Sequence, residues 1–554
     1  MTQPSASRVA LVEQFGRRRL ALLGIASILM PLVWLTVFGS TGRDDSFITF
    51  GIARQFAETG QLTNLNGDFV EGSTTLGYVL VLAVIGAVRP EAIPLIGWVI
   101  SLVMLGVSGL VAALAVGRSN PRMAWLVAAA VWAFPPFAYW SASGAETTTA
   151  VAVLLVALLL VGTTPNQATG IRPLLRGLAA SSVFLMRPDI GLTFAGVVAL
   201  VTVTQMIGQT RRGNALPWGM LWACIGILTG IVMVSLIRLI IFGVVLPQSV
   251  LAKVGGGSSA GVSSGIAYVE PFLRAPYVFV WMVLALMLAS WRLRQMSTLQ
   301  WLFLLQAGAG LLVVILSRGD WMEWGRLLLA PLVCLIVATV SLVPSAVPWR
   351  VIAPLIVLVL GANAVALSAM SSGQGLGSTG SDPTSRWSAA ESDPSTPWHG
   401  AASPYVKWNG VHLRDAIFLS EAVPAIQEIL DRQRPDTVLT LASEQAGMNF
   451  YYLRETFGNR IEFIDLYQLT TKHFSGCEGL ERNQAGRYVS PQYWAAQAND
   501  CAPPLPDLVI DVGYPKFEEL PGYRVIAGVT GKVTRSTGAE IPTNQFLVVS
   551  DSLD

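Results

Sequence analysis

Long apolar runs recur along this chain of 554 residues, and they restrict its fold more than any other feature. A helix needs about 20 predominantly apolar residues to cross the hydrocarbon core of a bilayer. With 53% hydrophobic and only 13% charged residues, the chain is predicted to be an α-helical polytopic membrane protein. Its net charge of +2 gives no reason to expect nucleic acid as a partner. The runs that reach or approach the required length are residues 20–39, 92–116, 125–140, 147–161, 191–207, 217–242, 277–290, 301–316, 327–343 and 351–370.

The positions of arginine predict how these helices are oriented, because short cytoplasmic loops collect positive charge. Two further apolar runs, 75–88 and 174–186, are too short to assign by length. All the basic clusters are cytoplasmic only if 174–186 crosses the bilayer and 75–88 does not. This choice predicts about eleven crossings of the plasma membrane, with residues 1–19 in the cytoplasm and the C-terminus outside. The clusters contain Arg8, Arg17, Arg18, Arg19, Arg118, Arg122, Arg172, Arg176, Arg211, Arg212, Arg292, Arg294 and Arg350.

The composition changes after residue 370. A Gly/Ser/Pro-rich linker at 371–398 separates the membrane domain, 20–370, from a polar segment at 399–554. Strands are expected at "DTVLTLAS", "DLVIDVG", "YRVIAGV" and "NQFLVVS", and a helix at "LRDAIFLSEAVPAIQEILDRQ", so this segment is predicted to be a small extracytoplasmic α/β or α+β domain. Cys477 and Cys501 both fall in it, where they either form a disulfide on the oxidising side of the membrane or remain free thiols.

Six polar stretches meet on the outer face in this topology: "RDDSF", "GDFVEGS", "SASGAET", "MRPD", "LPQSVLAKVGGG" and "SRGDWMEWGR". The first two belong to a long first outer loop, 41–91. A carboxylate beside a bound hydroxyl can act as a general base, while Arg and Lys can hold a phosphate as it leaves. The stretches therefore predict an active site for a lipid-linked phosphosugar at the membrane boundary. Its candidate residues are Asp44, Asp45, Glu71, Glu146, Arg187, Asp189, Arg238, Lys253, Asp320, Glu323 and Arg326.

The adjacent aspartates Asp44 and Asp45 are the expected catalytic residues. Asp44 is preferred as the base or charge-stabilising group and Asp45 as its neighbour in orientation or capping, although the order could be reversed. Either aspartate could instead cap the short helix "SFITFGIARQFAET", since Asp is favoured at helix N-caps. The sequence leaves open whether a divalent cation also lies near these carboxylates.

Other charged candidates also have structural explanations. Glu146 could complement the dipole of the helix that follows it. Arg187 could form a local ion pair with Asp189 at the break between two helices. Arg238, in the last turns of its helix, could extend outward to the interface.

The order of several motifs resembles that of a known group of enzymes. These motifs are "DDSFITFGIARQFAETGQLTNLNGDFVEGSTTLGYVL", "SASGAETTTAVAVLLVALLL", "MRPD", "IFGVVLPQSVLAK" and "RGDWMEWGRLLLAPL", and they span about residues 20 to 345. Together they resemble the GT-C-fold membrane glycosyltransferases, and more closely the AftB family of actinobacterial arabinofuranosyltransferases. "GMNFYYLRETFGNRIEFIDLYQLTTKHF" is similar to the tail of that family.

This resemblance implies transfer of a sugar from a polyprenyl-phosphate donor to an extracytoplasmic glycan. The donor would be decaprenyl-phosphoryl-arabinose and the acceptor a cell-envelope arabinan, that of arabinogalactan or lipoarabinomannan. An aspartate of the first outer loop would have the key catalytic role, and the segment 75–88 would lie along the membrane. Gln248 and Trp324, which fall inside the matching motifs, join the residues expected to bind substrate.

Three other functions compete with this interpretation. The enzyme could use another lipid-linked sugar. A transporter or flippase of envelope glycans would place polar groups in broken helices near the bilayer midplane and show two related halves, and the sequence shows no such repeat. A non-catalytic envelope assembly protein would depend on the C-terminal domain and would tolerate charge reversal in the outer loops.

The topology predicts which positions are accessible from each side of the membrane. In a cysteine-free background, Asp45→Cys should react with a membrane-impermeant maleimide added to intact cells, because the first outer loop faces outward. Arg212→Cys should react only after the membrane is opened. Labelling of Asp45→Cys from the cytoplasmic side alone would contradict the proposed orientation.

Overall fold

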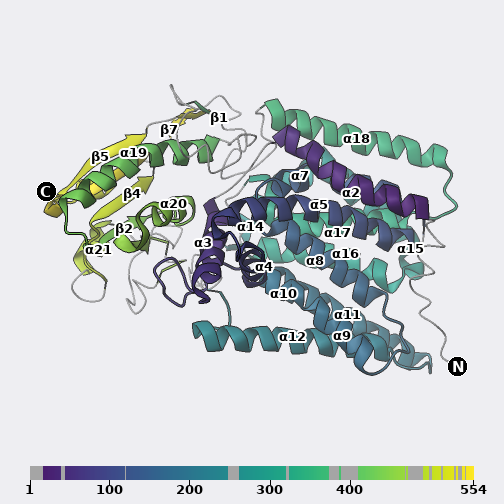
Figure 1. The fold of residues 1–554 in the computed structure, drawn as a ribbon. Helices are drawn as coiled ribbons and strands as arrows, with labels where there is room; N and C mark the ends of the chain where they lie inside the picture. The colour runs from purple at the N-terminus through teal and green to yellow at the C-terminus, as the bar shows by residue number, and fades with distance from the viewer. Residues whose placement is uncertain are drawn as a thin grey trace.

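The computed structural model has a helical bundle and a sheet-containing domain, which lie side by side (Figure 1). The C-terminus lies in the sheet-containing domain, at the end far from the bundle. The residues that the structure describes are 17–38, 44–118, 120–247, 261–317, 319, 323–372, 386–388, 410–467, 470–471, 491–497, 502–512, 516–529, 532–534, 540–542 and 544–553.

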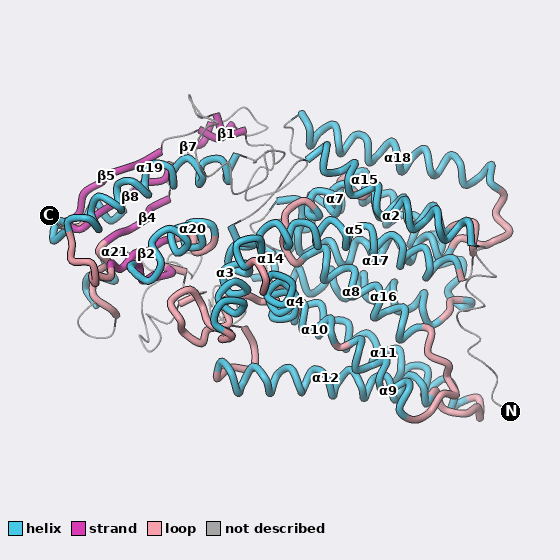
Figure 2. Tube along the Cα trace, viewed as in Figure 1, coloured by secondary structure: helices cyan, strands magenta, loops and turns pink. Residues whose placement is uncertain are grey.

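Each apolar run of the sequence forms helix in the bundle (Figure 2). The run 125–140 is divided between two helices because Pro135 and Pro136 follow its first half, and a proline cannot donate the backbone hydrogen bond that would continue a helix. The helices are α2 (Arg17–Phe38), α5 (Ile93–Gly117), α6 (Ala124–Trp132), α7 (Pro135–Ser141), α8 (Thr147–Gly162), α9 (Ile171–Ala180), α10 (Ser182–Met186), α11 (Pro188–Arg211), α12 (Trp218–Phe242), α14 (Gly261–Arg274), α15 (Pro276–Arg292), α16 (Thr298–Leu316), α17 (Leu329–Leu342) and α18 (Trp349–Ser372).

Six helices in the described part of the chain are long and apolar enough to cross a membrane. This identifies an integral membrane protein, while the expected count of about eleven crossings stays a prediction. The six are Pro90–Gly117, Pro188–Arg211, Trp218–Phe242, Pro276–Gln295, Thr298–Leu316 and Trp324–Leu342.

Local sequence sets the helix ends that position the candidate site residues. Pro188 is the first residue of α11, where its missing N–H costs nothing, so the chain turns at Arg187. Gly243 ends α12 with a φ of 73°, a left-handed conformation that suits glycine, and this leaves Arg238 one turn before the end.

Two short helices follow the first bundle helix in the outer loop. The helix α3 (Asp44–Thr59) begins with the two aspartates, and α4 (Leu76–Gly86) forms from the apolar run 75–88. Eleven residues of helix rise about 17 Å, roughly half of the ~30 Å hydrocarbon core, so α4 is too short to cross it. The 3₁₀ helix η1 (Pro90–Ala92) connects α4 to α5.

The C-terminal domain contains a mixed five-stranded sheet in the order β3-β2-β4-β8-β5. The strands β2 (Leu439–Ser443), β3 (Ile461–Asp465) and β4 (Leu508–Val512) are parallel, whereas β8 (Gln545–Ser550) runs antiparallel to β4 and to β5 (Tyr523–Val529). The four expected strands and the expected helix, α19 (Gly410–Arg432), are all present.

The domain also has elements that the sequence patterns did not indicate. These are β3, the helix α20 (Met448–Phe457), the short helix α21 (Pro491–Gln497), the 3₁₀ turn η5 (Gly458–Arg460) and a small sheet of β1 (Arg386–Ser388), β6 (Lys532–Thr534) and β7 (Glu540–Pro542). The strand β1 falls inside the expected linker 371–398, most of which lies outside the described residues, so the domain boundaries stay a prediction.

The helix α3 packs against both parts of the molecule and shares a hydrophobic core with the C-terminal domain. The ring of Phe47 lies 5.5 Å from the rings of both Tyr451 and Tyr452 on α20. Downstream in the same loop, the side-chain amide of Asn66 donates to the Phe463 carbonyl at 2.7 Å and accepts from the Phe463 N–H at 2.9 Å. Asn66 thus bonds to the edge strand β3 as a neighbouring strand would. These contacts fix the first outer loop against the domain.

Candidate active site

Seven of the charged candidates meet in three ion-pair groups: Asp45 with Arg326, Glu71 with Arg238, and Arg187 with Glu146 and Asp189. They come from the start of α3, the loop before α4, the turn before α8, the α10–α11 break, the end of α12 and the 3₁₀ helix η3 (Glu323–Leu328). Five predicted residues lie outside the described residues, and their positions stay predictions: Gln248, Lys253, Asp320, Cys477 and Cys501.

Asp44 binds the N-terminus of a helix in the other domain. Its carboxylate accepts hydrogen bonds from the backbone N–H groups of Met448, at 2.7 Å, and Gly447, at 3.2 Å, which begin α20. These are amides that α20 itself cannot satisfy, and the positive end of the helix dipole favours the charge. A Cβ on Gly447 would lie 1.9 Å from the Asp44 carbonyl oxygen, so only glycine fits there. The capping role considered from the sequence therefore exists, but it serves α20 rather than α3.

Asp45 faces the opposite direction and pairs with Arg326. The Nη1 of Arg326 donates to Asp45 Oδ2 at 2.9 Å. The Arg326 side chain is only 7% exposed, whereas that of Asp45 is 35% exposed. The Arg326 guanidinium also lies 5.8 Å from the ring centroid of Trp140, at a distance suited to a cation–π contact. Asp45 is thus a carboxylate accessible to solvent that is held by a buried cation.

A left-handed turn sets the direction of Arg326. Trp324 has a φ of 53°, a conformation that costs a non-glycine residue roughly 1–2 kcal/mol, and Gly325 follows with a φ of 61°. Among the described residues Trp324 is the only non-glycine residue with a positive φ. Its ring is 2% exposed and lies 6.2 Å from that of Tyr139. The buried indole therefore fixes the turn that directs Arg326 toward Asp45.

Arg187 holds two carboxylates at the break between α10 and α11. Its Nε and Nη2 donate to the two oxygens of Asp189, at 3.1 and 3.0 Å, and its Nη1 donates to Glu146 at 3.3 Å. The local ion pair considered from the sequence is thus present, and it extends to Glu146 in the turn before α8. The bidentate contact fixes the side chains of Arg187 and Asp189 relative to each other.

Arg238 differs from the sequence expectation. It does not extend outward but is fully buried, with its Nε 3.0 Å from both oxygens of Glu71 and its guanidinium 5.2 Å from the Phe184 ring. The reason is that Glu71, 4% exposed, offers a charged partner inside the protein. Both Nη atoms of Arg238 lack a hydrogen-bond partner. Burial raises the pKa of Glu71 to about 7, although Arg238 opposes the shift.

Neutral hydrogen bonds join the loops that carry these charges. Ser46 of α3 donates to the Ser143 carbonyl at 3.3 Å, and Thr49 bonds Ser73 at 3.0 Å. The Tyr78 hydroxyl lies 2.9 Å from the Gly97 carbonyl oxygen and 3.0 Å from that of Gly144. Sequence reasoning did not single out these supporting residues, because isolated serines, threonines and tyrosines carry no recognisable pattern.

The aromatic and backbone partners of the charged residues were missed as well. In the sequence, Trp140 and Phe184 lie within apolar runs, and nothing there indicates that they contact an arginine. Gly447 and Met448 stand at the start of the "GMNFYYLRETF" motif, and the one available signal was the glycine before an apolar helix.

The arrangement places three guanidinium groups, each paired with at least one carboxylate, in a dry environment. Arg187, Arg238 and Arg326 are 7%, 0% and 7% exposed. Buried guanidinium groups bind phosphate strongly because each offers a planar set of donors. Within the described residues, no group of three or more His, Cys, Asp or Glu side chains is placed to hold a metal ion.

Two solved structures share this fold. The match to ArnT from Cupriavidus metallidurans, bound to undecaprenyl phosphate, has a TM-score of 0.53 at 14% identity and covers 96% of this chain and 98% of ArnT. The match to the archaeal oligosaccharyltransferase AglB from Archaeoglobus fulgidus, in complex with an inhibitory peptide and a dolichol-phosphate, has a TM-score of 0.50 at 10% identity and covers 92% of this chain and 70% of AglB. The chain matches no protein-family model and none of the curated proteins.

These matches define the class of the protein at the level of fold. It is an integral membrane protein with the architecture of ArnT and AglB, which supports the GT-C fold predicted from the sequence motifs. Membership of the AftB family stays a prediction.

The Asp44 contact predicts a loss of docking rather than a loss of chemistry. Asp44→Ala should weaken the attachment of α20 to α3 by roughly 0.5–2 kcal/mol, the usual cost of removing a cap. Hydrogen exchange should then accelerate at the amides of residues 447–449 and in α3. Glu91→Ala, which removes an exposed carboxylate of the same loop that pairs with Arg89, is the matched control. Unchanged exchange in Asp44→Ala would show that the contact does not hold the domain.

Proposed function

We propose that this protein is a membrane glycosyltransferase that uses a polyprenyl-phosphate-linked sugar as donor and an extracytoplasmic glycan as acceptor. The observation that carries the proposal is the group of three buried arginines at one end of the bundle, each paired with a carboxylate from another loop. Such a site can bind a lipid phosphate and also provide a base. ArnT bound to undecaprenyl phosphate and AglB bound to a dolichol-phosphate, both of this fold, support a donor of this class.

The donor phosphate is proposed to bind Arg238 and Arg326. Arg238 has two Nη atoms without partners, so these can donate hydrogen bonds to a phosphate while its Nε stays bonded to Glu71. Arg326 can exchange the Asp45 carboxylate for a phosphate oxygen. Lys253, predicted from the sequence, would add a third cation. The prenyl tail would lie in the bilayer and the sugar would face Asp45.

Asp45 is proposed as the catalytic carboxylate, with the roles of the two aspartates exchanged relative to the preferred sequence interpretation. Asp44 is occupied by the amides of α20, whereas Asp45 is accessible and released when Arg326 turns to the phosphate. The acceptor hydroxyl then loses its proton to Asp45 as its oxygen bonds to the anomeric carbon. The bond from that carbon to the phosphate oxygen breaks, and polyprenyl phosphate leaves. The arginines stabilise the negative charge of this leaving group.

The finer proposal is arabinofuranosyl transfer from decaprenyl-phosphoryl-arabinose to cell-envelope arabinan. It is supported by the ordered motifs over residues 20 to 345, which resemble those of the AftB family. In this proposal the site and the C-terminal domain face the extracytoplasmic side. The decisive experiment incubates purified protein with a panel of radiolabelled polyprenyl-phosphate sugars and a neutral oligosaccharide acceptor. If none of these donors supports transfer, the proposed function is wrong.

Asp45→Asn should lower the transfer rate by about 10²–10⁴-fold, since a positioned general base contributes this much. Donor binding and thermal stability should stay close to those of the wild type. Glu91→Gln, which removes an exposed carboxylate from the same outer loop, is the control and should keep full activity. Full transfer by Asp45→Asn would assign the base to another carboxylate.

The Glu71–Arg238 pair predicts that donor affinity depends on pH. The pKa of Glu71 is about 7, so the carboxylate is protonated as the pH falls through 7 and no longer neutralises Arg238. The donor is a phosphodiester whose charge is constant in this range, so its affinity should rise severalfold between pH 8 and pH 6. Glu71→Gln should remove the dependence and keep the high affinity. Identical titrations of wild type and Glu71→Gln would contradict this account.

A further inference from the structure

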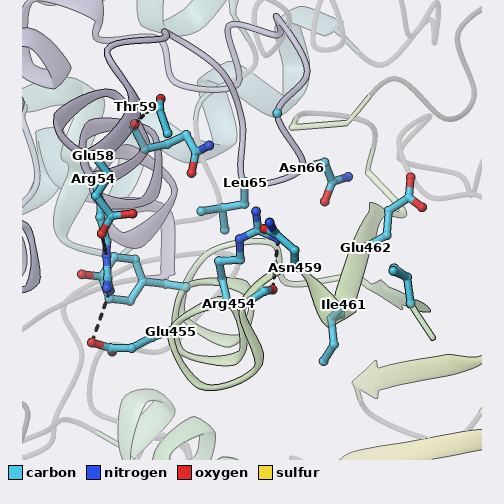
Figure 3. A pocket seen from close by; sticks show the side chains of 15 residues that line it. Arg54, Glu58, Thr59, Leu65, Asn66, Arg454, Glu455, Asn459, Ile461 and Glu462 are labelled. Carbon is cyan, nitrogen blue, oxygen red and sulfur yellow. Dashed lines mark hydrogen bonds and ion pairs between the residues drawn. The ribbon is translucent and has the colours of Figure 1, made fainter. Parts of the chain in front are cut away.

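A cavity of about 630 Å³ lies where the first outer loop meets the C-terminal domain (Figure 3). One side is formed by the second half of α3 and the loop at residues 65–67. The other side is formed by α20, η5 and the start of β3. None of the residues in the three ion-pair groups lines it, so it is separate from the proposed catalytic site.

The lining of the cavity is polar and nearly balanced in charge. Two arginines, Arg54 and Arg454, stand against three glutamates, a formal balance of one negative charge. Hydroxyl and amide side chains, the aromatic ring of Tyr451 and three aliphatic side chains, those of Leu65, Val438 and Ile461, complete it. This lining does not suit a polyanion such as nucleic acid or a lipid phosphate, and it does not suit an apolar ligand. It suits a neutral molecule rich in hydroxyl groups. The glutamates are Glu58, Glu455 and Glu462, and the neutral polar residues are Gln55, Thr59, Asn66 and Asn459.

Arg54 holds the cavity in shape from one side. Its Nε donates to Glu58 at 2.7 Å, its Nη1 lies 3.2 Å from Glu455 Oε1, and its guanidinium lies 5.5 Å from the ring centroid of Tyr451. Arg54 thereby ties α3 to α20 across the cavity wall (Figure 3). On the other side the bonds of Asn66 to β3 fix the loop. A cavity whose walls are held in this way loses little entropy when a ligand binds.

We propose that this cavity binds the acceptor glycan at sugars distant from the one that reacts. The proposal rests on the proposed function. Arg54 lies nine residues beyond Asp45 on α3, about 14 Å along the helix axis at 1.5 Å per residue and about 180° around it at 100° per residue, so an acceptor that reaches both must also pass around the helix. A single sugar at Asp45 does not span this distance, but a short oligosaccharide does. Volumes of 300–1,000 Å³ are typical of sites for small ligands. The cavity therefore selects acceptors of several neutral sugar units.

The test compares acceptors of different length in the transfer assay. Asn459→Trp adds bulk at an exposed position of the lining, and Glu462→Ala removes a polar group three residues further along the same wall. Each variant should raise KM for an arabinofuranose hexasaccharide about five- to tenfold, the loss expected from one or two hydrogen bonds. The kcat, the donor KM and the KM for the disaccharide should change less than twofold. Glu428→Ala, an exposed glutamate of α19 outside the cavity, is the control.

A direct binding measurement separates this inference from the proposed function. Saturation-transfer NMR should detect the hexasaccharide on wild-type protein and on Asp45→Asn, and the signal should fall in both cavity variants. If wild-type protein transfers no sugar but this binding pattern holds, the proposed function fails and the cavity remains a glycan site. If transfer occurs but both cavity variants keep the wild-type KM for the hexasaccharide, the cavity assignment is wrong. Equal binding to wild type and both cavity variants also overturns it.

Discussion

The docking of α3 against α20 is the interaction on which the rest of the candidate site depends. Phe47 packs against Tyr451 and Tyr452 of α20, and this contact buries apolar surface between the two helices. The Asp44 carboxylate accepts hydrogen bonds from the first amides of α20 and so fixes how the two helices are oriented. Because helical side chains change direction by about 100° per residue, fixing Asp44 toward α20 turns Asp45 away from it, toward Arg326. The C-terminal domain thus sets the orientation of a carboxylate that it does not itself contain.

The three arginine pairs follow from the cost of burying charge. A guanidinium in a dry environment without a partner is strongly unfavourable, so each of the three draws a carboxylate from another loop. These pairs hold together loops that the sequence separates by up to 281 positions. A phosphate offers the same arginines an equivalent partner. In the proposed function, the donor phosphate would replace a carboxylate at a site that is already stable without it.

Much of the fold follows from hydrophobic length and periodicity. Every apolar run forms helix, and the short run 75–88 forms α4, which is too short to cross the hydrocarbon core. The break at Pro135 also has a local cause, since a proline pair interrupts a helix, although apolar length alone predicts one continuous run at 125–140. The strands of the C-terminal domain were visible as short apolar stretches, while α20 and β3 were hidden because their aromatic and charged residues show no clear period.

The sequence by itself determined the membrane class, the helices and the set of loops that carry charge, because these depend on local composition and on the thickness of a bilayer. Only the tertiary structure decided the partners: that Asp44 binds α20, that Asp45 binds Arg326, and that Arg238 is buried against Glu71 instead of extending outward. Contacts between residues hundreds of positions apart leave no local pattern in a single chain. They exist because α3, packed between the bundle and the sheet domain, brings those residues to one place.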